Sequence, residues 1–493
     1  MFDPIYCNPT PIASTGESSG THTQFGYEAI EERGQRRRGT AVIQSEDREL
    51  THAQRAKLIG STRDVIRNYA LVGWMVRRHL DYVTQFHFQC NTNDDDFNTA
   101  LEQRVEQRCR RMNCDVRGQF TLDKYIRTAE LCKVRDGDLG TTYMRSGHLQ
   151  AIEGDRIRTP NLNDYGNPVD SKQWFNGVRV NGAGRPLEYG IWNRISGGPS
   201  MIFDRTVNAR NFYLLANVDR FDQVRGVSPI ASAMNNLVDL KENITYALLK
   251  SKVAQFFGLV LKRSDEDSAG EVTNDGTNGD EKNAFEVDFG RGPFTLDLNI
   301  DEDASFLTTN VPGDSFKEFH ELVMMIVLKC LDLPMAFFDE ARTNFFASKG
   351  AWLMYDRACI SKRDDVAELL NWVTVKDLLR WIVDPLDPLV LPAGYTIGTL
   401  PFEWVPRGMP WWDKGKEVDA DIAAIGAGLS NPYAVCRRTD SDYEENIRLI
   451  ARARKFARDA GQEILGEPIE VSFVPGPKPT QVEVTNQPEE SNQ

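Results

Sequence analysis

Few residues in this sequence have the types and the spacing that catalysis requires. Gly16–Gly20 reads GESSG, which has the letters of the serine elbow found in hydrolases. That elbow needs a strand before it and a helix after it to strain the serine, and only polar sequence precedes Gly16. The sequence also lacks a G-x-x-x-x-G-K-[ST] run, which is one class of phosphate-binding loop. The motifs therefore indicate neither a serine hydrolase nor an ATP motor.

Metal-binding patterns are equally weak. The six histidines form no HExxH pair, and the eight cysteines include no C-x-x-C pair that would indicate a zinc site. Asn91–Asn98 reads NTNDDDFN, which lacks the glycine and the final glutamate of an EF-hand calcium loop, so we interpret it as a turn between helices. We expect no metal and no cofactor. Eight cysteines without a disulfide framework suit a reducing cytoplasm.

An enzyme with a dispersed carboxylate site remains an alternative. The chain contains 72 Asp and Glu residues, so acidic pairs arise without any catalytic purpose. Asp94–Asp96 together with Asp136 or Asp138 would be the candidates for a metal-dependent nuclease or hydrolase. A monomeric scaffold or adaptor protein is another alternative. Nothing in the sequence positively supports catalysis, and we predict a protein that is not an enzyme.

The bulk composition is that of a soluble globular protein of about three domains. The 493 residues are 41% hydrophobic, and no apolar run approaches the ~18 residues that a membrane span requires. The polar N-terminus has no signal-peptide pattern. The net charge of −14 argues against a protein that grips a phosphate backbone over its whole surface. An acidic wall would instead suit a conduit past which nucleic acid slides.

The hydrophobic periodicity predicts helices on both sides of a β-rich middle, which favours an α+β fold. Helical spacing runs from Gln44 to Cys90 and returns over 97–112 and 119–138, after which short strands are expected. The strand-like segments are 139–160, 188–195, 200–207 and 209–217.

The second half alternates long helices with a small β insertion. Ser228 and Pro229 form a helix start, and this helix reaches Phe257. Residues 258–263 and 284–298 read as strands around an acidic loop at 264–283. A second helix ends before Pro334, a third runs over 351–383, and further helices lie between Asp413 and Gly461.

Three segments, in this order, resemble the portal proteins of tailed bacteriophages, specifically the lambda-type portal family. They are RDVIRNYALVGWMVRRHLDYV from Arg63, DRFDQVRGVSPIASAMNNLVDL from Asp219, and the helical segment from Trp411 to Gly461 with its AGLSNP break. The resemblance spans roughly Leu50 to Gly461. The chain departs from the family at two places. Residues 344–349 read NFFASK, where the family commonly has an NYSS-x-R-like segment. The acidic loop at 264–283 resembles an insertion.

The resemblance implies a portal fold with a mixed α/β wing, a two-helix stem, a small β-containing clip, a tunnel loop and a helical crown. The implied parts are an N-terminal arm at 1–45, the wing at 46–227, the first stem helix at 228–257, the clip at 258–312, the second stem helix at 313–332, the tunnel loop at 333–350, a long helix and return to the wing at 351–412, the crown helices at 413–465 and a disordered tail at 466–493.

The resemblance also implies a function. Such proteins form a dodecameric ring at one capsid vertex of the virion, through which double-stranded DNA enters during packaging and leaves during ejection. The expected partners are further copies of the chain, DNA without sequence specificity, the ATP-hydrolysing terminase large subunit, a head–tail connector or adaptor, and the major capsid protein with its scaffold. No membrane is involved. The ring would assemble in the host cytoplasm.

Two sets of candidate residues follow from this comparison. The tunnel-loop candidates, which would contact the phosphates and the shape of DNA without reading bases, are Arg342, Thr343, Asn344, Phe345, Phe346 and Lys349. Arg342 and Lys349 would be the phosphate contacts. The stem-packing candidates are Leu322, Val323, Ile326 and Val327. The sequence leaves open which of these four face the chain's own core and which face a neighbour.

Overall fold

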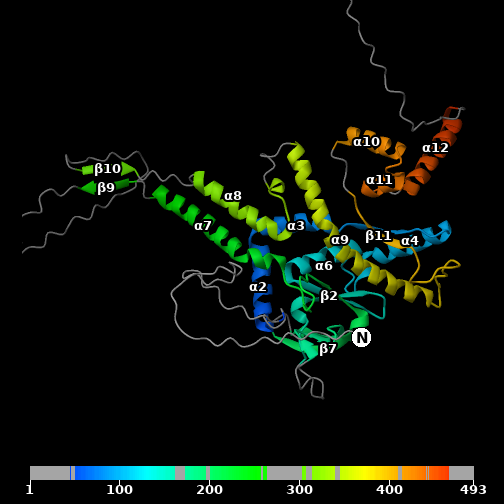
Figure 1. Cartoon of the computed structure of the whole chain (residues 1–493), viewed down its shortest axis with the longest axis horizontal. Coiled ribbons are helices and arrows are strands. Elements are labelled where there is room, and N and C mark those ends of the chain that lie inside the picture. The colour runs from blue at the N-terminus through cyan, green and yellow to red at the C-terminus, as the bar shows by residue number, and fades with distance from the viewer. Residues whose placement is uncertain are drawn as a thin grey trace, which may run out of the picture.

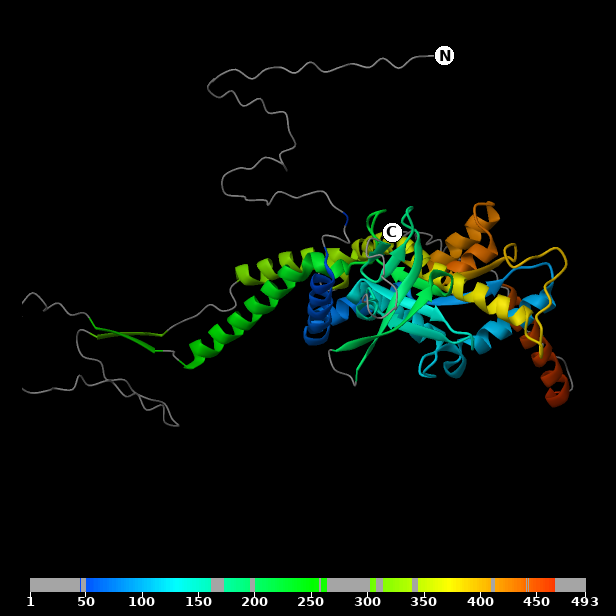
Figure 2. The ribbon, with the colours of Figure 1, turned by 90° about the horizontal axis from the view of Figure 1, so that it is seen from below.

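The computed structural model has an α/β body, a two-helix arm on one side of it and a cluster of helices on the other (Figures 1 and 2). The structure describes residues 45, 50–160, 173–195, 200–256, 259–263, 302–306, 314–338, 345–408, 413–439, 441 and 443–465. Helices and antiparallel strands both contribute to the body, which confirms the predicted α+β class.

The body is built from short elements. Its helices are α2 (His52–Asn68), α3 (Ala70–Val83), α4 (Asp95–Cys109), α5 (Arg111–Cys114) and α6 (Leu122–Asp136), with 3-10 turns η1 (Gly154–Arg156) and η3 (Ala209–Asn211). Its strands are β1 (Phe86–Cys90), β2 (Asp138–Tyr143), β3 (Leu149–Glu153), β4 (Trp174–Phe175), β5 (Val178–Val180), β6 (Pro186–Arg194), β7 (Met201–Asn208), β8 (Phe212–Ala216) and β11 (Phe402–Pro406).

The first helical region is shorter than the sequence pattern predicts. Thr51 and Gln54 form a capping box that starts α2, because each side chain meets the backbone N–H of the other residue. Tyr69 adopts an extended backbone between α2 and α3. The expected helix from Gln44 to Cys90 is therefore wrong at its end, where residues 86–90 form strand β1. Asn91–Asn98 accordingly links a strand to a helix and not two helices.

Three antiparallel sheets make up the body's β-structure. Their strand orders are β3-β2-β8, β4-β5-β6-β7 and β1-β11, and the first two confirm the predicted β-rich middle. The two-stranded sheet was not predicted from sequence. It brings Phe88 opposite Trp404, and Trp404 Nε1 donates a hydrogen bond to Thr374 Oγ1 at 2.9 Å. Strand β11 thus pairs with β1, although more than 300 residues separate the two strands in the sequence.

Two apolar cores lie within this body. The larger collects side chains from α3, α4, α6, β2 and the long helix described below. The smaller joins side chains of the four-stranded sheet, such as Tyr189 and Ile191, to Ile152 of β3 and Phe212 of β8. Phe212 of β8 stacks on Tyr189 at a centroid distance of 4.0 Å, which links the two sheets.

The arm consists of α7 (Met234–Phe256) and α8 (Asp314–Leu328), which pack against each other (Figure 1). Ser228 accepts a hydrogen bond from the Ile230 N–H, but the chain first forms a 3-10 turn, η4 (Pro229–Ala233), so the α-helix begins later than the predicted 228. Strands β9 (Leu259–Arg263) and β10 (Glu302–Phe306) pair as an antiparallel hairpin. The predicted strand at 284–298 lies outside the described residues.

The helices after the arm begin with a second set of 3-10 turns, η5 (Lys329–Leu331) and η6 (Met335–Phe337). The long helix α9 (Phe345–Ile382) starts six residues before the predicted position 351, because residues 345–350 join it instead of forming a loop. The remaining cluster comprises α10 (Lys414–Gly426), α11 (Pro432–Arg438) and α12 (Tyr443–Leu465). No helix in the described ranges is long and apolar enough to cross a membrane.

A buried arginine marks the junction between the body and the arm. The Arg225 side chain is fully buried, and its Nε and Nη2 donate to the two carboxylate oxygens of Asp138 at 2.6 and 2.8 Å. The same guanidinium donates to the backbone carbonyls of Gly154, Ile157 and Asn176. One side chain thus holds four separate segments together.

Two glycines allow this junction to close. Gly137 ends α6 with a φ of +96°, and a Cβ there would lie 2.6 Å from the Gly226 carbonyl oxygen. A Cβ on Gly226 would lie 2.0 Å from the Gly137 carbonyl oxygen. Any side chain at either position would separate the two backbones and pull Arg225 away from Asp138.

We predict that Arg225→Ala destabilises the fold by roughly 3–5 kcal/mol, because it leaves the Asp138 carboxylate buried without its main partner. Arg225→Lys should also be destabilising, since an ammonium cannot reproduce the planar fork. Urea unfolding followed by circular dichroism measures both. The control is Arg78→Ala, which removes an exposed pair with Asp81 and should change stability by less than about 1 kcal/mol. Equal losses in Arg225→Ala and the control would contradict this role.

Candidate functional site

The candidate loop residues before the long helix lie only partly in the described chain. Arg342, Thr343 and Asn344 are outside the described residues, and Phe345 and Phe346 begin α9. Lys349 follows one turn later, where its Nζ lies 2.6 Å from Glu417 Oε1 on α10. The start of α9 is therefore joined to the helical cluster by an ion pair that sequence reasoning did not anticipate.

A cavity of about 1010 Å³ surrounds this ion pair, between α9, the β1–β11 sheet and helices α10–α12. Two further cations of its lining also meet carboxylates: Arg363 donates to Asp356 at 2.7 Å, and Arg438 pairs with Asp421. These pairs leave no concentrated charge of one sign among those groups. The cavity is best described as the joint where the helical cluster meets the body.

The four stem candidates divide into two classes. Val327 is 1% exposed and belongs to the main core, and Val323 packs partly buried against it. Leu322 is 53% exposed and Ile326 is 48% exposed. Since they stand four positions apart on α8, Leu322 and Ile326 share one helical face. The structure thus settles what the sequence left open about the folded chain's own core.

Both helices of the arm carry further exposed apolar side chains. These are Val238, Ile244, Tyr246, Leu248 and Leu249 on α7, and Phe319 and Met325 on α8. The arm itself projects from the body in both views of the molecule (Figures 1 and 2). Apolar groups that cluster on a projecting element mark a contact surface.

The carboxylates considered for catalysis have structural partners. Asp94 caps α4 by accepting from the Phe97 N–H at 3.0 Å, and Asp95 and Asp96 follow in the first helical turn, where negative charge favours a helix. Asp138 is held by Arg225. Among the described residues, no group of three or more His, Cys, Asp or Glu side chains could hold a metal ion. These contacts offer no support for the nuclease alternative.

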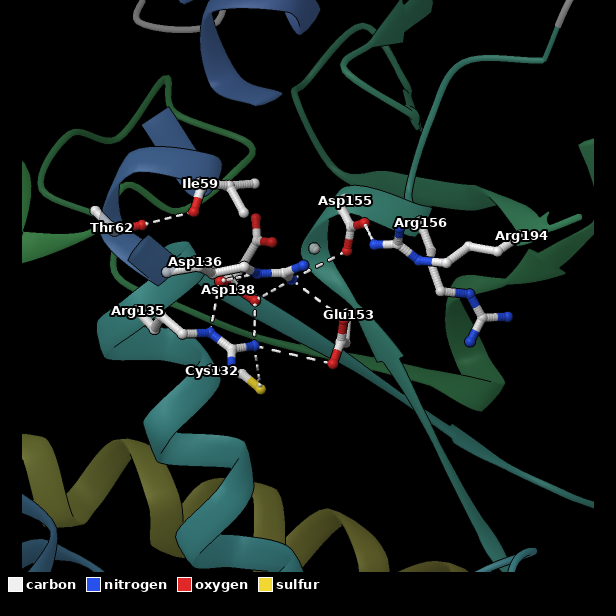
Figure 3. Close-up of polar contacts among 12 residues, drawn as sticks. Ile59, Thr62, Cys132, Arg135, Asp136, Asp138, Glu153, Asp155, Arg156 and Arg194 are labelled. Atoms are coloured by element: carbon white, nitrogen blue, oxygen red, sulfur yellow. Dashed lines mark hydrogen bonds and ion pairs between the residues drawn. The ribbon is translucent and has the colours of Figure 1, made fainter. Parts of the chain in front are cut away.

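Asp136 is buried and is the centre of a charged network within the body (Figure 3). Arg63 donates to both of its carboxylate oxygens, at 2.8 and 2.6 Å, and Arg135 does so at 2.8 Å for each. Arg63 also reaches Glu153 at 3.2 Å and Asp155 at 3.1 Å. The network ties α2 to the end of α6 and to the turn after β3.

The arginines set the ionisation of Asp136. Burial alone would raise the pKa of its carboxyl, but the hydrogen bonds from Arg63 and Arg135 outweigh burial and hold the pKa below its ordinary value. A carboxylate whose pKa is depressed in the folded state stabilises the fold above its unfolded pKa. That contribution is lost as the pH falls through the folded pKa.

We predict that Asp136→Asn lowers the free energy of unfolding by about 3 kcal/mol near pH 7. The difference from the wild-type chain should begin to shrink below about pH 4, where the carboxyl of the unfolded chain takes up a proton while the folded carboxylate stays ionised. It should disappear once the pH falls below the lowered pKa of Asp136 in the folded state. Urea unfolding between pH 2 and 7 measures this, with Asp387→Asn as a control that removes an exposed carboxylate paired with Arg104. A difference that does not change with pH would contradict the assigned ionisation.

The family model described as "Phage portal protein, lambda family" matches residues 33–360, about two thirds of the chain. No curated protein matches the sequence significantly.

Solved structures give distant matches. A chain from the virion of a native gene transfer agent particle shares 13% identity at a TM-score of 0.46, covering 76% of this chain and 91% of that one. Chains from the neck of the empty particle, computed with C6 symmetry, and of the native particle, computed with C12 symmetry, each share 14% identity. Their TM-scores are 0.43 and 0.41, with coverage of 79% and 76% of this chain and 93% and 91% of theirs.

Proposed function

Because the chain belongs to the lambda family of phage portal proteins, we propose that twelve copies close into a ring around a channel for double-stranded DNA. The family match confirms the resemblance found in the sequence and identifies a structural portal protein, not an enzyme. A portal protein is a component of the virion at its portal vertex. Our proposal adds that DNA passes through the centre of this ring during packaging and ejection.

The observation that carries the proposal is the exposed apolar surface of the arm. Leu322 and Ile326 on α8, with Tyr246, Leu248 and Leu249 on α7, stay open to solvent although they are large and apolar. In a ring of identical chains, one face of each copy packs against a different face of the next copy, and this contact buries such exposed apolar side chains. Burying apolar area at roughly 25 cal/mol per Å² then favours the closed ring.

We assign the parts of the portal fold from the order of the elements. In this assignment α7 and α8 are the two stem helices, the β9–β10 hairpin belongs to the clip, α10–α12 form the crown, and the sheets with α2–α6 form the wing. The hairpin follows α7 and precedes α8 in the chain, and it lies beyond the free end of the arm in both views (Figures 1 and 2), which supports this order.

The contacts with DNA would use charge and shape without reading bases, since a conduit must accept every sequence. Arg342 remains our proposed phosphate contact in the tunnel loop, together with the neighbouring candidates Thr343, Asn344, Phe345 and Phe346. Lys349 has a different proposed role. Its ion pair with Glu417 neutralises its charge and holds the first turns of α9 against the crown helix α10.

The remaining partners are proposed on the strength of the family. The large terminase subunit would dock on the clip. It would supply the ATP hydrolysis, because this sequence contains no phosphate-binding loop of the Walker type. A head–tail connector would later use the same end of the ring. The major capsid protein and scaffold would contact the wing.

We predict that Leu322→Glu combined with Ile326→Glu abolishes ring assembly and leaves a folded monomer. Both side chains are already exposed in the single chain, so charge there should cost little in folding but would oppose burial at an interface. Light scattering gives the mass of the purified protein, and negative-stain microscopy shows whether a central hole is present. DNA content of particles carrying the variant then tests passage of DNA.

A matched control uses two exposed charged positions on the same helix, Lys317→Gln with Glu318→Gln, which keep the net charge unchanged. The control should still form rings. Rings of unchanged mass in the double glutamate variant would contradict the proposed interface, and a wild-type protein that stays monomeric while particles fill with DNA would contradict the proposed function.

A further inference from the structure

The last crown helix, α12, carries a charge opposite to that of the whole chain. Residues 446–458 contain five basic residues and no acidic residue, although the net charge of the protein is −14. All five side chains are exposed: Arg448, Arg452, Arg454, Lys455 and Arg458. The tunnel-loop interpretation makes no use of this basic segment.

Helical geometry places part of this charge on one open face. Arg448, Arg452 and Lys455 follow the i, i+4, i+7 spacing and therefore lie on one side of α12. Ile450 and Ala457, which are half-buried, fall on the opposite side. Small alanines at 451, 453 and 457 leave the basic side chains uncrowded. Arg448 lies 3.6 Å from Glu444 in an exposed ion pair of little strength, and Asp459 follows Lys455 by one turn.

Two contacts tie the start of α12 to α11. The ring of Tyr433 on α11 packs against that of Tyr443 in a tilted arrangement, with a centroid distance of 4.9 Å, and the Tyr433 hydroxyl donates to Glu444 at 3.4 Å. Beyond these contacts the helix extends from the body on the side away from the arm (Figures 1 and 2). Phe456 is 73% exposed there, beside the basic face. Arg448, Arg452 and Lys455 are exposed on this part of the helix.

We propose that the basic face of α12 binds the phosphate backbone of double-stranded DNA at the crown end of the ring. This inference rests on the proposed function, because a ring gathers every copy of the basic segment around one axis. Like charges held together repel one another, and a polyanion on the axis removes that repulsion. The partner that the proposal already places in the ring is such a polyanion.

The length and chemistry of the face suit this ligand. Arg448 to Arg458 spans about 15 Å at 1.5 Å per residue, and one DNA strand presents a phosphate for each ~3.4 Å of axis. The helix can therefore meet several successive phosphates. Arginine and lysine contacts to phosphate oxygens position a duplex without reading its sequence. Leu449 and Phe456, on the flank of the face, would pack against a neighbouring copy.

The test compares DNA binding by assembled wild-type rings with binding by a triple variant, Arg448→Gln, Arg452→Gln and Lys455→Gln. Glutamine preserves helix propensity. The probe is a fluorescent 30-base-pair duplex of arbitrary sequence, followed by anisotropy across a salt series. We expect the variant to bind at least about tenfold more weakly at 100 mM salt, with a shallower dependence of log K on log salt.

Two further variants make the result specific. The matched control is Lys57→Gln, Arg145→Gln and Arg185→Gln, which removes the same charge from exposed positions elsewhere and should leave binding within about twofold of the wild type. Asp459→Asn removes an exposed carboxylate one turn after Lys455 and should strengthen binding.

The outcomes separate this inference from the proposed function. Rings that form normally but bind DNA equally well with and without the three basic residues would overturn the inference and leave the ring intact. Equal losses in the triple variant and its control would also overturn it, because only net charge would then matter. Binding of α12-intact rings to vesicles of phosphatidylserine, with no α12-dependent binding to DNA, would assign the face to a membrane instead. Failure of every chain to form rings would instead contradict the proposed function.

Discussion

The fold depends on one buried ion pair, between Arg225 and Asp138. Asp138 starts β2 immediately after α6, and Arg225 stands shortly before the turn that leads into α7. Their contact fixes where the arm leaves the body. Because both side chains are fully buried, the pair is stable only while the surrounding carbonyls accept the remaining guanidinium hydrogens. Gly137 and Gly226 make room for that arrangement. A second, less buried network around Asp136 joins α2 to the same place.

The arm that leaves this junction carries large apolar side chains that remain exposed in the single chain. On α8, Val327 packs inward while Leu322 and Ile326 remain exposed, so the helix has one face for its own core and another for a neighbour. A rigid junction matters for such a surface. The closed ring that we propose needs every copy to present its two faces at the same angle, and a flexible attachment would add entropy cost to each contact.

The helical and strand segments were largely predictable where periodicity was long. The strands at β6, β7 and β8 and the helix α8 follow from alternation or helical spacing over many residues. The β1–β11 pairing did not, because two five-residue strands separated by more than 300 residues carry no local signal of each other. The early start of α9 was missed for a related reason. The pattern at 345–350 resembles a loop segment of the portal family, and tertiary contacts such as Lys349 with Glu417 extend the helix there.

The candidate residues show the same division. The sequence identified apolar positions on α8, but it could not show that Val327 is buried and Leu322 exposed, since both residues fit the same helical pattern. Arg225 lay within a segment that resembled the family, yet only the structure gives it a partner in Asp138, 87 residues away. The basic segment of α12 was visible as charge in the sequence. Its significance depends on the open face that the three-dimensional arrangement gives it.

The measurement that tests the account most directly is electron cryo-microscopy of the purified, assembled full-length protein. The account predicts a closed ring with a central channel, in which the faces of α7 and α8 that carry Tyr246, Leu322 and Ile326 lie between neighbouring copies. A closed assembly in which these side chains face solvent, or a two-fold dimer that places the same face of each copy together, would contradict it.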